Sequence, residues 1–428
     1  MTSEFAQRVG FTLGALLIYR LGCNIPLPGV KFEVLEMILR TQRPIGMMSL
    51  LLPPSGLRHA AIFALGITPY ISAAVLVQLA GILSRRLRSL QMQGAAGRLI
   101  ERRITLCLTV VLAGFQAWGV ALALEKINAQ GTAESTDILF LISTVITLAG
   151  GTIFLAWLSE QIGAFGIGNG IALILLSGTA TIFANPIDAI VDGSQHGYLT
   201  SNACVGIVVV TIFLTVFVVL MEQARRQFPI DYPERRIGER TFRNLTAVMP
   251  IKLNLAGIIP VILAAWMLGV IGTFLDLLDL TGSHYPHWVM TIARQLAPGA
   301  PAHLLLYGIL IVFCTFFYTA YLFDPEDVAE RLRQDGGVIR SIAPGEPTVA
   351  HLDRALSWTS AFGAIYLAAI CLLPEILMSY ARPPFRFGGV SLLILVCTVL
   401  DLETQVRGYL RAKPGQTPAP RKTVLRET

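Results

Sequence analysis

Few residues of this sequence have the types and spacing that catalysis requires. The run Gly166-Ile167-Gly168-Asn169-Gly170 is similar to a phosphate-binding loop, but no strand is predicted before it and Ile171 stands where the third glycine belongs. We interpret the run as a tight turn between two helices. The patterns G-x-x-x-x-G-K-[ST], H-E-x-x-H and G-x-S-x-G are absent. No catalytic site is predicted, and the chain is not expected to be an enzyme.

The cysteines form no metal or redox pattern. They stand singly, without a C-x-x-C pair, and most lie in apolar runs, where cysteine behaves as a small apolar residue. Neither a disulfide framework, a metal site nor a cofactor is predicted. The six are Cys23, Cys107, Cys204, Cys314, Cys371 and Cys397.

Composition explains why catalytic residues are scarce. Of the 428 residues, 54% are hydrophobic and 14% are charged, whereas soluble domains carry about 25% charged residues. With a mean hydropathy of +0.65, too few polar residues remain to cover soluble domains. The composition predicts a polytopic, all-α membrane protein.

Ten segments are apolar enough and nearly long enough for membrane helices, which need about 20 apolar residues. A cleaved signal peptide ending near Cys23 is a weaker interpretation of the first segment than a retained helix, because Arg20 interrupts its end. The predicted segments are 9–23, 66–83, 104–124, 138–158, 170–183, 205–221, 255–275, 303–323, 355–373 and 388–406.

Positive charge sets the orientation of these helices. On one side lie 24 of the 33 Lys and Arg residues, in the N-terminus, the segments 84–103, 222–253 and 324–354, and the tail. Cytoplasmic loops carry the excess of Lys and Arg, so both termini are predicted to be cytoplasmic.

Two of these cytoplasmic loops are too long and too charged for simple connectors. The 222–253 loop has a polar, proline-containing middle and predicts a protruding hairpin. The 324–354 loop begins with Asp324-Pro325, a favourable helix start, and its helix is predicted to stop at Gly336-Gly337. The alternative is that both loops are only positive-inside anchors.

Two helices at matching places in the two halves are interrupted. Pro69 lies in the first turn of the second segment, and Pro53, Pro54 and Gly56 isolate a short segment at 55–63 before it. In the seventh segment, Gly257 and Pro260 predict a kink. Interrupted helices in corresponding positions indicate an inverted-repeat transport architecture, although Pro and Gly are also common in ordinary membrane helices.

Polar residues inside the predicted spans are mostly isolated amides: Gln78, Gln116 and Asn254. An ion pump would be expected to carry ionisable residues at membrane depth, but Glu160, Asp401 and Glu403 lie near predicted cytoplasmic ends. Isolated amides are as readily explained by hydrogen bonds between helices.

Several motifs resemble the SecY family, the channel subunits of bacterial protein translocases. The similarity runs from about residue 5 to residue 411 and implies ten helices in two inverted halves around a pore. We expect these halves at 1–195 and 196–411, with a tail at 412–428. The motifs are IPLPG (25–29), AIFALGITPYISA (61–73), FGIGNGIALI (165–174), LNLAGIIPVI (253–262), FFYTAYLFDPEDVAERL (316–332), LLPEIL (372–377) and FGGVSLLI (387–394).

The resemblance implies roles for individual residues. A constriction of aliphatic tips is expected at Ile67, Ile71, Leu175, Ile262 and Ile394, and a plug at about 55–63, including Ser55, Gly56, Leu57, Arg58 and His59. A lateral gate is expected at Ser72, Gln78, Gln116, Asn254 and Ala256. The expected docking cations are Arg225, Arg226, Arg235, Arg236, Arg240, Arg243, Arg331, Arg333 and Arg340.

The implied partners are small SecE-like and SecG-like membrane subunits, a SecA-like motor ATPase, the ribosome, signal sequences, nascent chains and the lipid bilayer. The implied location is the bacterial inner membrane. Such a channel would pass unfolded secretory polypeptides across this membrane and release membrane segments sideways into it.

Two segments depart from the family pattern. Residues 93–100 read QGAAGRLI in place of E-G-E-x-G-R-R-K, and 341–345 read SIAPG in place of G-I-R-P-G. Ala343 therefore replaces a loop arginine, and we hypothesise that Arg340, three residues earlier, takes over its contact with the motor or ribosome. The alternative is that this tip has lost its role.

Composition and inverted halves alone would also fit a secondary transporter, and an intramembrane enzyme is a more distant alternative. A transporter should carry a substrate-specific polar cluster at mid-membrane and needs no large cytoplasmic projections. Co-purification of small single-span subunits would favour the channel.

Overall fold

The computed structural model describes residues 2–30, 61–84, 95–127, 138–180, 201–232, 235–237, 240–242, 246–280, 291, 295–296, 300–340, 342–381 and 388–411. The core of the expected plug, Ser55 to His59, lies outside these residues, as do Arg243 and the tail 412–428.

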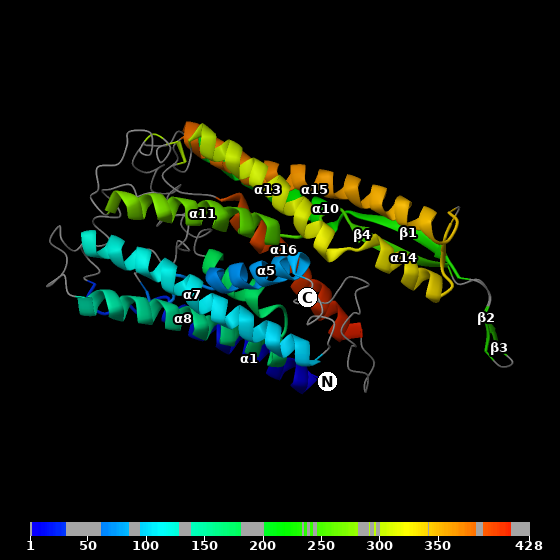
Figure 1. The fold of residues 1–428 in the computed structure, drawn as a ribbon, viewed down its shortest axis with the longest axis horizontal. Coiled ribbons are helices and arrows are strands. Elements are labelled where there is room, and N and C mark those ends of the chain that lie inside the picture. Colours follow the sequence, from blue (N-terminus) through cyan, green and yellow to red (C-terminus); the bar gives the residue numbers. More distant parts are fainter. Residues whose placement is uncertain are drawn as a thin grey trace.

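Each of the ten predicted segments contains a helix, which confirms the all-α membrane fold (Figure 1). Within the described residues, α7, α8, α13, α15 and α16 have the length and hydropathy of a membrane span. The helices are α1 (Thr2–Gly22), α5 (Thr68–Leu83), α7 (Ala95–Ile127), α8 (Ile138–Phe165), an unlabelled helix (Gly170–Ala180), α10 (Ser201–Gln223), α11 (Ile259–Leu280), α13 (Pro301–Leu322), α14 (Pro325–Gln334), α15 (Glu346–Ala381) and α16 (Gly389–Arg411).

Prolines and glycines set the starts of the interrupted helices. As predicted, Pro69 lies in the first turn of α5, where its missing N–H costs no hydrogen bond. The prediction of a kink inside the helix at Gly257 and Pro260 is wrong. Gly257 has a φ of 64°, so the chain turns before α11, and Pro260 is the second residue of that helix.

The helices pack mainly in two groups that follow chain order. In the first group α5, α7 and α8 pack against one another and α1 packs against α8. In the second group α15 packs against α13, α14 and α16, and α10 packs against α16. Helix α11 packs against α13 of its own group and also against α5 and α7 of the first. Helix α11 therefore contacts both groups.

The two charged loops form one small body at one end of the helices (Figure 1). The strands β1 (Arg225–Asp231) and β4 (Thr246–Lys252) pair antiparallel, which confirms the predicted hairpin, and β5 (Val338–Ile339) of the second loop pairs with the other edge of β1. A separate two-stranded hairpin consists of β2 (Arg235–Ile237) and β3 (Arg240–Phe242).

This body has its own apolar core. Phe228 and Ile230 of β1 pack with Val328 and Leu332 of α14 and with Leu352 of α15. The buried face of α14 therefore holds the second loop against the hairpin of the first.

The beginning of α1 and the end of α16 lie at the same end of the molecule as this body (Figure 1). The ring centroids of Phe5 and Tyr409 are 6.3 Å apart, and Arg8 Nη1 donates to the hydroxyl of Tyr409 at 3.4 Å. Both ends of the described chain are thus on one side, as the charge distribution predicted.

Candidate functional site

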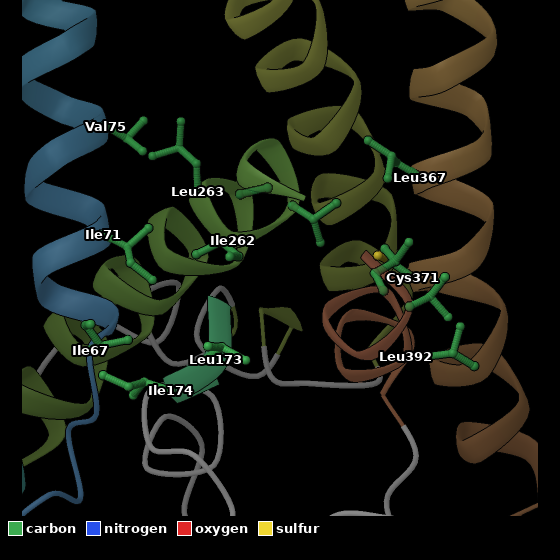
Figure 2. Close-up of a cluster of buried hydrophobic side chains, with 14 of the residues drawn as sticks. Ile67, Ile71, Val75, Leu173, Ile174, Ile262, Leu263, Leu367, Cys371 and Leu392 are labelled. Atoms are coloured by element: carbon green, nitrogen blue, oxygen red, sulfur yellow. The ribbon is translucent and has the colours of Figure 1, made fainter. Parts of the chain in front are cut away.

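A buried hydrophobic cluster runs through most of the helices, and Figure 2 shows the part of it where α5, the helix Gly170–Ala180, α11, α15 and α16 lie. Figure 2 shows the side chains of Ile71 and Val75 on the face of α5 that is turned toward Ile262 and Leu263 of α11. The exposed fraction of Ile71 is 6% and that of Ile262 is 9%. The two side chains therefore close the seam between α5 and α11 with apolar surface.

Three of the five predicted constriction residues, Ile67, Ile71 and Ile262, belong to this cluster. Leu175 is partly buried against it. Ile394 is 6% exposed but is not a member of the cluster, to which α16 contributes Leu392, Leu393 and Val396.

Sequence reasoning missed Val75, Leu173, Ile174 and Leu263, which lie in the same cluster (Figure 2). A signal for Val75 was present, since Ile67, Ile71 and Val75 repeat at four-residue spacing on one helix face. No such signal separates Ile174 from Leu175, because both lie in one continuous apolar run.

The glycine-rich run 166–170 positions the helix that supplies Leu173 and Ile174. The N–H of Ile167 donates to Thr12 Oγ1 of α1 at 2.9 Å, and the N–H of Gly168 donates to Gln405 Oε1 of α16 at 2.9 Å. Gly168 has a φ of 92°. The run is the tight turn that the sequence predicts.

The predicted gate residues lie on α5, on α7 and in the turn before α11, and α11 packs against both of these helices. Ser72 of α5 is buried and its hydroxyl donates to Thr68 O of its own helix. Gln78 Oε1 and Gln116 Nε2 are buried and have no hydrogen-bond partner among the described residues. Ala256 is also buried, in the turn before α11.

Asn254, the third predicted amide, bonds to α10 and to the turn before α11. Its Nδ2 donates to Glu222 Oε1 of α10 at 2.7 Å, and its Oδ1 accepts from the N–H of Gly257 at 3.1 Å. Asn254 therefore fixes the turn that begins α11. Glu222 was not predicted as a site residue.

The expected plug region is described only from Ala61 onward. Ala61 bridges to Pro26, and the ring of Phe63 stacks between Tyr19 and Phe154 at centroid distances of 6.2 and 5.7 Å. These contacts anchor the end of the segment to α1 and α8.

The predicted docking cations are spread over the strands and α14. Arg225 and Arg226 are exposed on β1, and Arg331 is exposed on α14. Arg333 makes a bidentate pair with Glu330 at 2.8 Å for both contacts, and its hydrogen bonds lower the pKa of Glu330. On the backbone, Arg235 and Arg236 lie in β2, and Arg240 lies in β3.

Arg340 already has a partner within the chain. Its Nε and Nη2 donate to the two carboxylate oxygens of Asp231, both at 3.0 Å. Hydrogen bonding to Asp231 raises the pKa of Arg340. The pair joins the end of β5 to the end of β1, so this guanidinium is held against the hairpin of the other loop.

Comparisons with known proteins agree with this architecture. The SecY family model matches residues 61–403. The protein translocase subunit SecY of Pseudomonas aeruginosa is 37% identical over 413 residues, which cover 95% of this chain and 91% of that protein. The Escherichia coli K12 subunit is 36% identical over 406 residues, with 94% and 91% covered.

Solved structures share the fold. A protein-conducting channel superposes with a TM-score of 0.68 at 20% identity, over 94% of this chain and 92% of that one. Sec61 in the canine ribosome–channel complex superposes with a TM-score of 0.65 at 17% identity and the same coverage.

The fold and the comparisons thus define a polytopic helical membrane channel. The chain belongs to the SecY family, and it is a protein-conducting translocation channel subunit rather than an enzyme.

Proposed function

We propose that Ile67, Ile71, Leu175, Ile262 and Ile394 form the constriction that seals this channel at rest. The observation that carries the proposal is that α5 packs against α11 and that Ile71 of the one and Ile262 of the other are buried in the same hydrophobic cluster. Aliphatic tips exclude water and ions when they close together, yet they hold no polar group that would bind a passing polypeptide.

Planar-bilayer conductance tests this constriction. The Ile71→Gly/Ile262→Gly variant lacking residues 55–63 should conduct ions at rest, because both the narrowest contact and the proposed plug are removed. The same deletion with glycine at Val111 and Ile146, which are 66% and 67% exposed, is the matched control. A non-conducting Ile71/Ile262 variant would refute the assignment.

The lateral gate is proposed between α11 and the pair α5 and α7. Its support is that α11 packs directly on both helices and that Gln78 and Gln116 leave buried amide atoms without partners among the described residues. Such a seam is less costly to open than a fully hydrogen-bonded interface.

Crosslinking tests the gate. A verified Ser72→Cys/Ala256→Cys crosslink should block insertion of membrane proteins, whereas each single cysteine should not. Full insertion activity in the crosslinked channel would contradict lateral exit between these helices.

The remaining assignments complete this proposal. Residues 1–195 and 196–411 act as two halves, the segment at about 55–63 is the plug, and the channel lies in the bacterial inner membrane with both termini in the cytoplasm. SecE-like and SecG-like subunits stabilise it, and a SecA-like motor or the ribosome docks on the two loops and drives transport. The single body formed by the strands and α14 at the end that holds both termini supports this docking surface.

A further inference from the structure

Glu222 is a buried carboxylate in the last turn of α10 that the proposed constriction and gate do not use. Its exposed fraction is 8%. Asn254 Nδ2 donates to its Oε1 at 2.7 Å, and the hydroxyl of Tyr366 on α15 donates to the same atom at 3.4 Å. Cys397 of α16 is a further hydrogen-bonding neighbour. Glu222 thus connects the turn before α11 with three helices of the second group.

The turn that Glu222 holds is the entry to α11. Asn254 Oδ1 accepts from the N–H of Gly257 at 3.1 Å, and its Nδ2 also donates to Gly257 O at 3.2 Å. The N–H of Leu253 donates to Ala224 O, just beyond α10, at 3.0 Å. On the other side Gly363 of α15 leaves so little room that a Cβ there would lie 3.1 Å from Leu253 O.

These contacts determine which of the two helix groups α11 moves with. Past the turn, α11 has neighbours in both groups, α13 on one side and α5 and α7 on the other. Because Gly257 lacks a side chain and has a φ of 64°, the backbone at the turn resists rotation little by itself. Besides the backbone bond from Leu253 to Ala224, the side-chain bond from Asn254 to Glu222 restrains the turn, and a hydrogen bond to a buried carboxylate is stronger than one between neutral groups.

We infer that Glu222 is a positioning residue of the gate: through Asn254 it holds the start of α11 to α10, α15 and α16, so that α11 leaves α5 only when the whole second group moves. The inference rests on the proposed lateral gate. It predicts that loss of the restraint lets α11 move alone, and that the channel then opens for substrates whose signals are too weak to move the whole group.

Signal selectivity distinguishes this role from a general contribution to stability, because the loss of stability would only lower export. Export of one secretory precursor is measured with an intact signal sequence and with an arginine in the signal's hydrophobic core, in cells that have this chain as their sole SecY-family channel. In Glu222→Leu the defective precursor should be exported at least about tenfold more than in wild type, while export of the intact precursor should stay within about twofold of wild type. A tenfold change corresponds to ~1.4 kcal/mol in the equilibrium between the closed and open gate.

Matched variants identify the bond that is responsible. Glu222→Gln should reject the defective precursor as wild type does, because its carbonyl oxygen still accepts from Asn254. Asn254→Asp removes the donor and should export the defective precursor, and Asn254→Asp/Glu222→Gln should restore rejection because the donor and acceptor are exchanged. Glu403→Leu removes an exposed carboxylate of α16 and should leave selectivity unchanged.

The outcomes separate this inference from the proposed channel. Rejection of the defective precursor by Glu222→Leu, or failure of the double variant to restore rejection, would overturn the positioning role. If Glu222→Leu does not accumulate in the membrane, Asn254→Asp and the double variant decide the question. Failure of the wild-type chain to export the intact precursor would overturn the channel proposal, and the positioning role with it.

Discussion

Replacing Gly170 with alanine should destabilise the channel through one close helix contact. A Cβ at residue 170 would lie 2.0 Å from the carbonyl oxygen of Ser159 and 2.9 Å from its Cα, both backbone atoms of α8. Real Cβ atoms stay at least about 3 Å from such atoms, so the two helices must separate by about 1 Å. Backbone cannot rotate away as a flexible side chain does.

The expected cost is about 1–3 kcal/mol, the range for overpacked interiors. Separation would also displace Leu173 and Ile174, which the same helix contributes to the buried cluster. We therefore expect Gly170→Ala to lower the midpoint of thermal unfolding of the purified channel and to raise ion leak in planar bilayers.

Gly163→Ala is the matched control for this experiment. Gly163 lies on α8 one turn after Ser159, and a Cβ there would meet no atom within 4 Å. Alanine in a helix interior is favoured over glycine by about 1 kcal/mol, so this control should be neutral or stabilising. If Gly170→Ala unfolds at the same temperature as Gly163→Ala, the close approach of the two backbones is refuted.

Three further perturbations follow from individual contacts. The exchange Asp231→Arg/Arg340→Asp should restore the motor-driven export in vitro that Arg340→Asp alone reduces, because the exchange rebuilds the bidentate pair. If the double variant exports as poorly as the single one, Arg340 contacts the motor instead. His303→Leu should lower thermal stability by about 1–3 kcal/mol, more than His303→Gln, because Nε2 lies 3.3 Å from Glu375 Oε1 and Nδ1 lies 3.1 Å from a carbonyl oxygen. Equal unfolding midpoints for the two variants would contradict this expectation. Asp324→Ala, but not Asp324→Asn, should speed amide exchange in the first turn of α14 by removing a cap worth about 1 kcal/mol, since Oδ1 accepts from the N–H of Glu326; unchanged exchange would exclude the cap.

Features that depend on neighbouring residues in the chain were predictable. The start of α14 follows from Asp324 and Pro325, and its end from Gly336. The hairpin of β1 and β4 also joins segments of one loop. In each case the residues that interact are near in sequence, so their types and spacing carry the information.

Features that depend on distant segments were not predictable. The strand β5 has two residues, too few for a β pattern, and exists because β1 offers an unpaired edge. Glu222 was assigned to a loop because it follows an apolar run, but the turn at Asn254 and Tyr366 of α15 cover it. Arg340 was expected to contact the motor or ribosome because Ala343 replaces the family's loop arginine, whereas its partner within the chain, Asp231, lies 109 residues away and has no local signature.

Part of the buried cluster depends both on local sequence, which sets where helices begin, and on the packing of distant segments. Ile71, Leu173, Ile262 and Leu392 are each the fourth residue of their helix, and all four belong to the cluster (Figure 2). These four members therefore come from helix starts, whereas Leu367 and Cys371 of the same cluster come from the interior of α15. Helix starts are set by local turn chemistry, so the places of these four side chains depend little on how far each helix extends.

Glycines with positive φ make three of these starts possible. Gly66, Gly168 and Gly257 have φ values of 61°, 92° and 64°, and each lies two residues before a helix begins. Any other residue would pay about 1–2 kcal/mol for this left-handed conformation. Such a turn lets the chain change direction inside the bundle and begin a helix there, and the fourth residue of that helix belongs to the buried cluster. The motifs LGITP, GIGNG and AGIIP thus share one physical task, although no catalytic or binding pattern connects them.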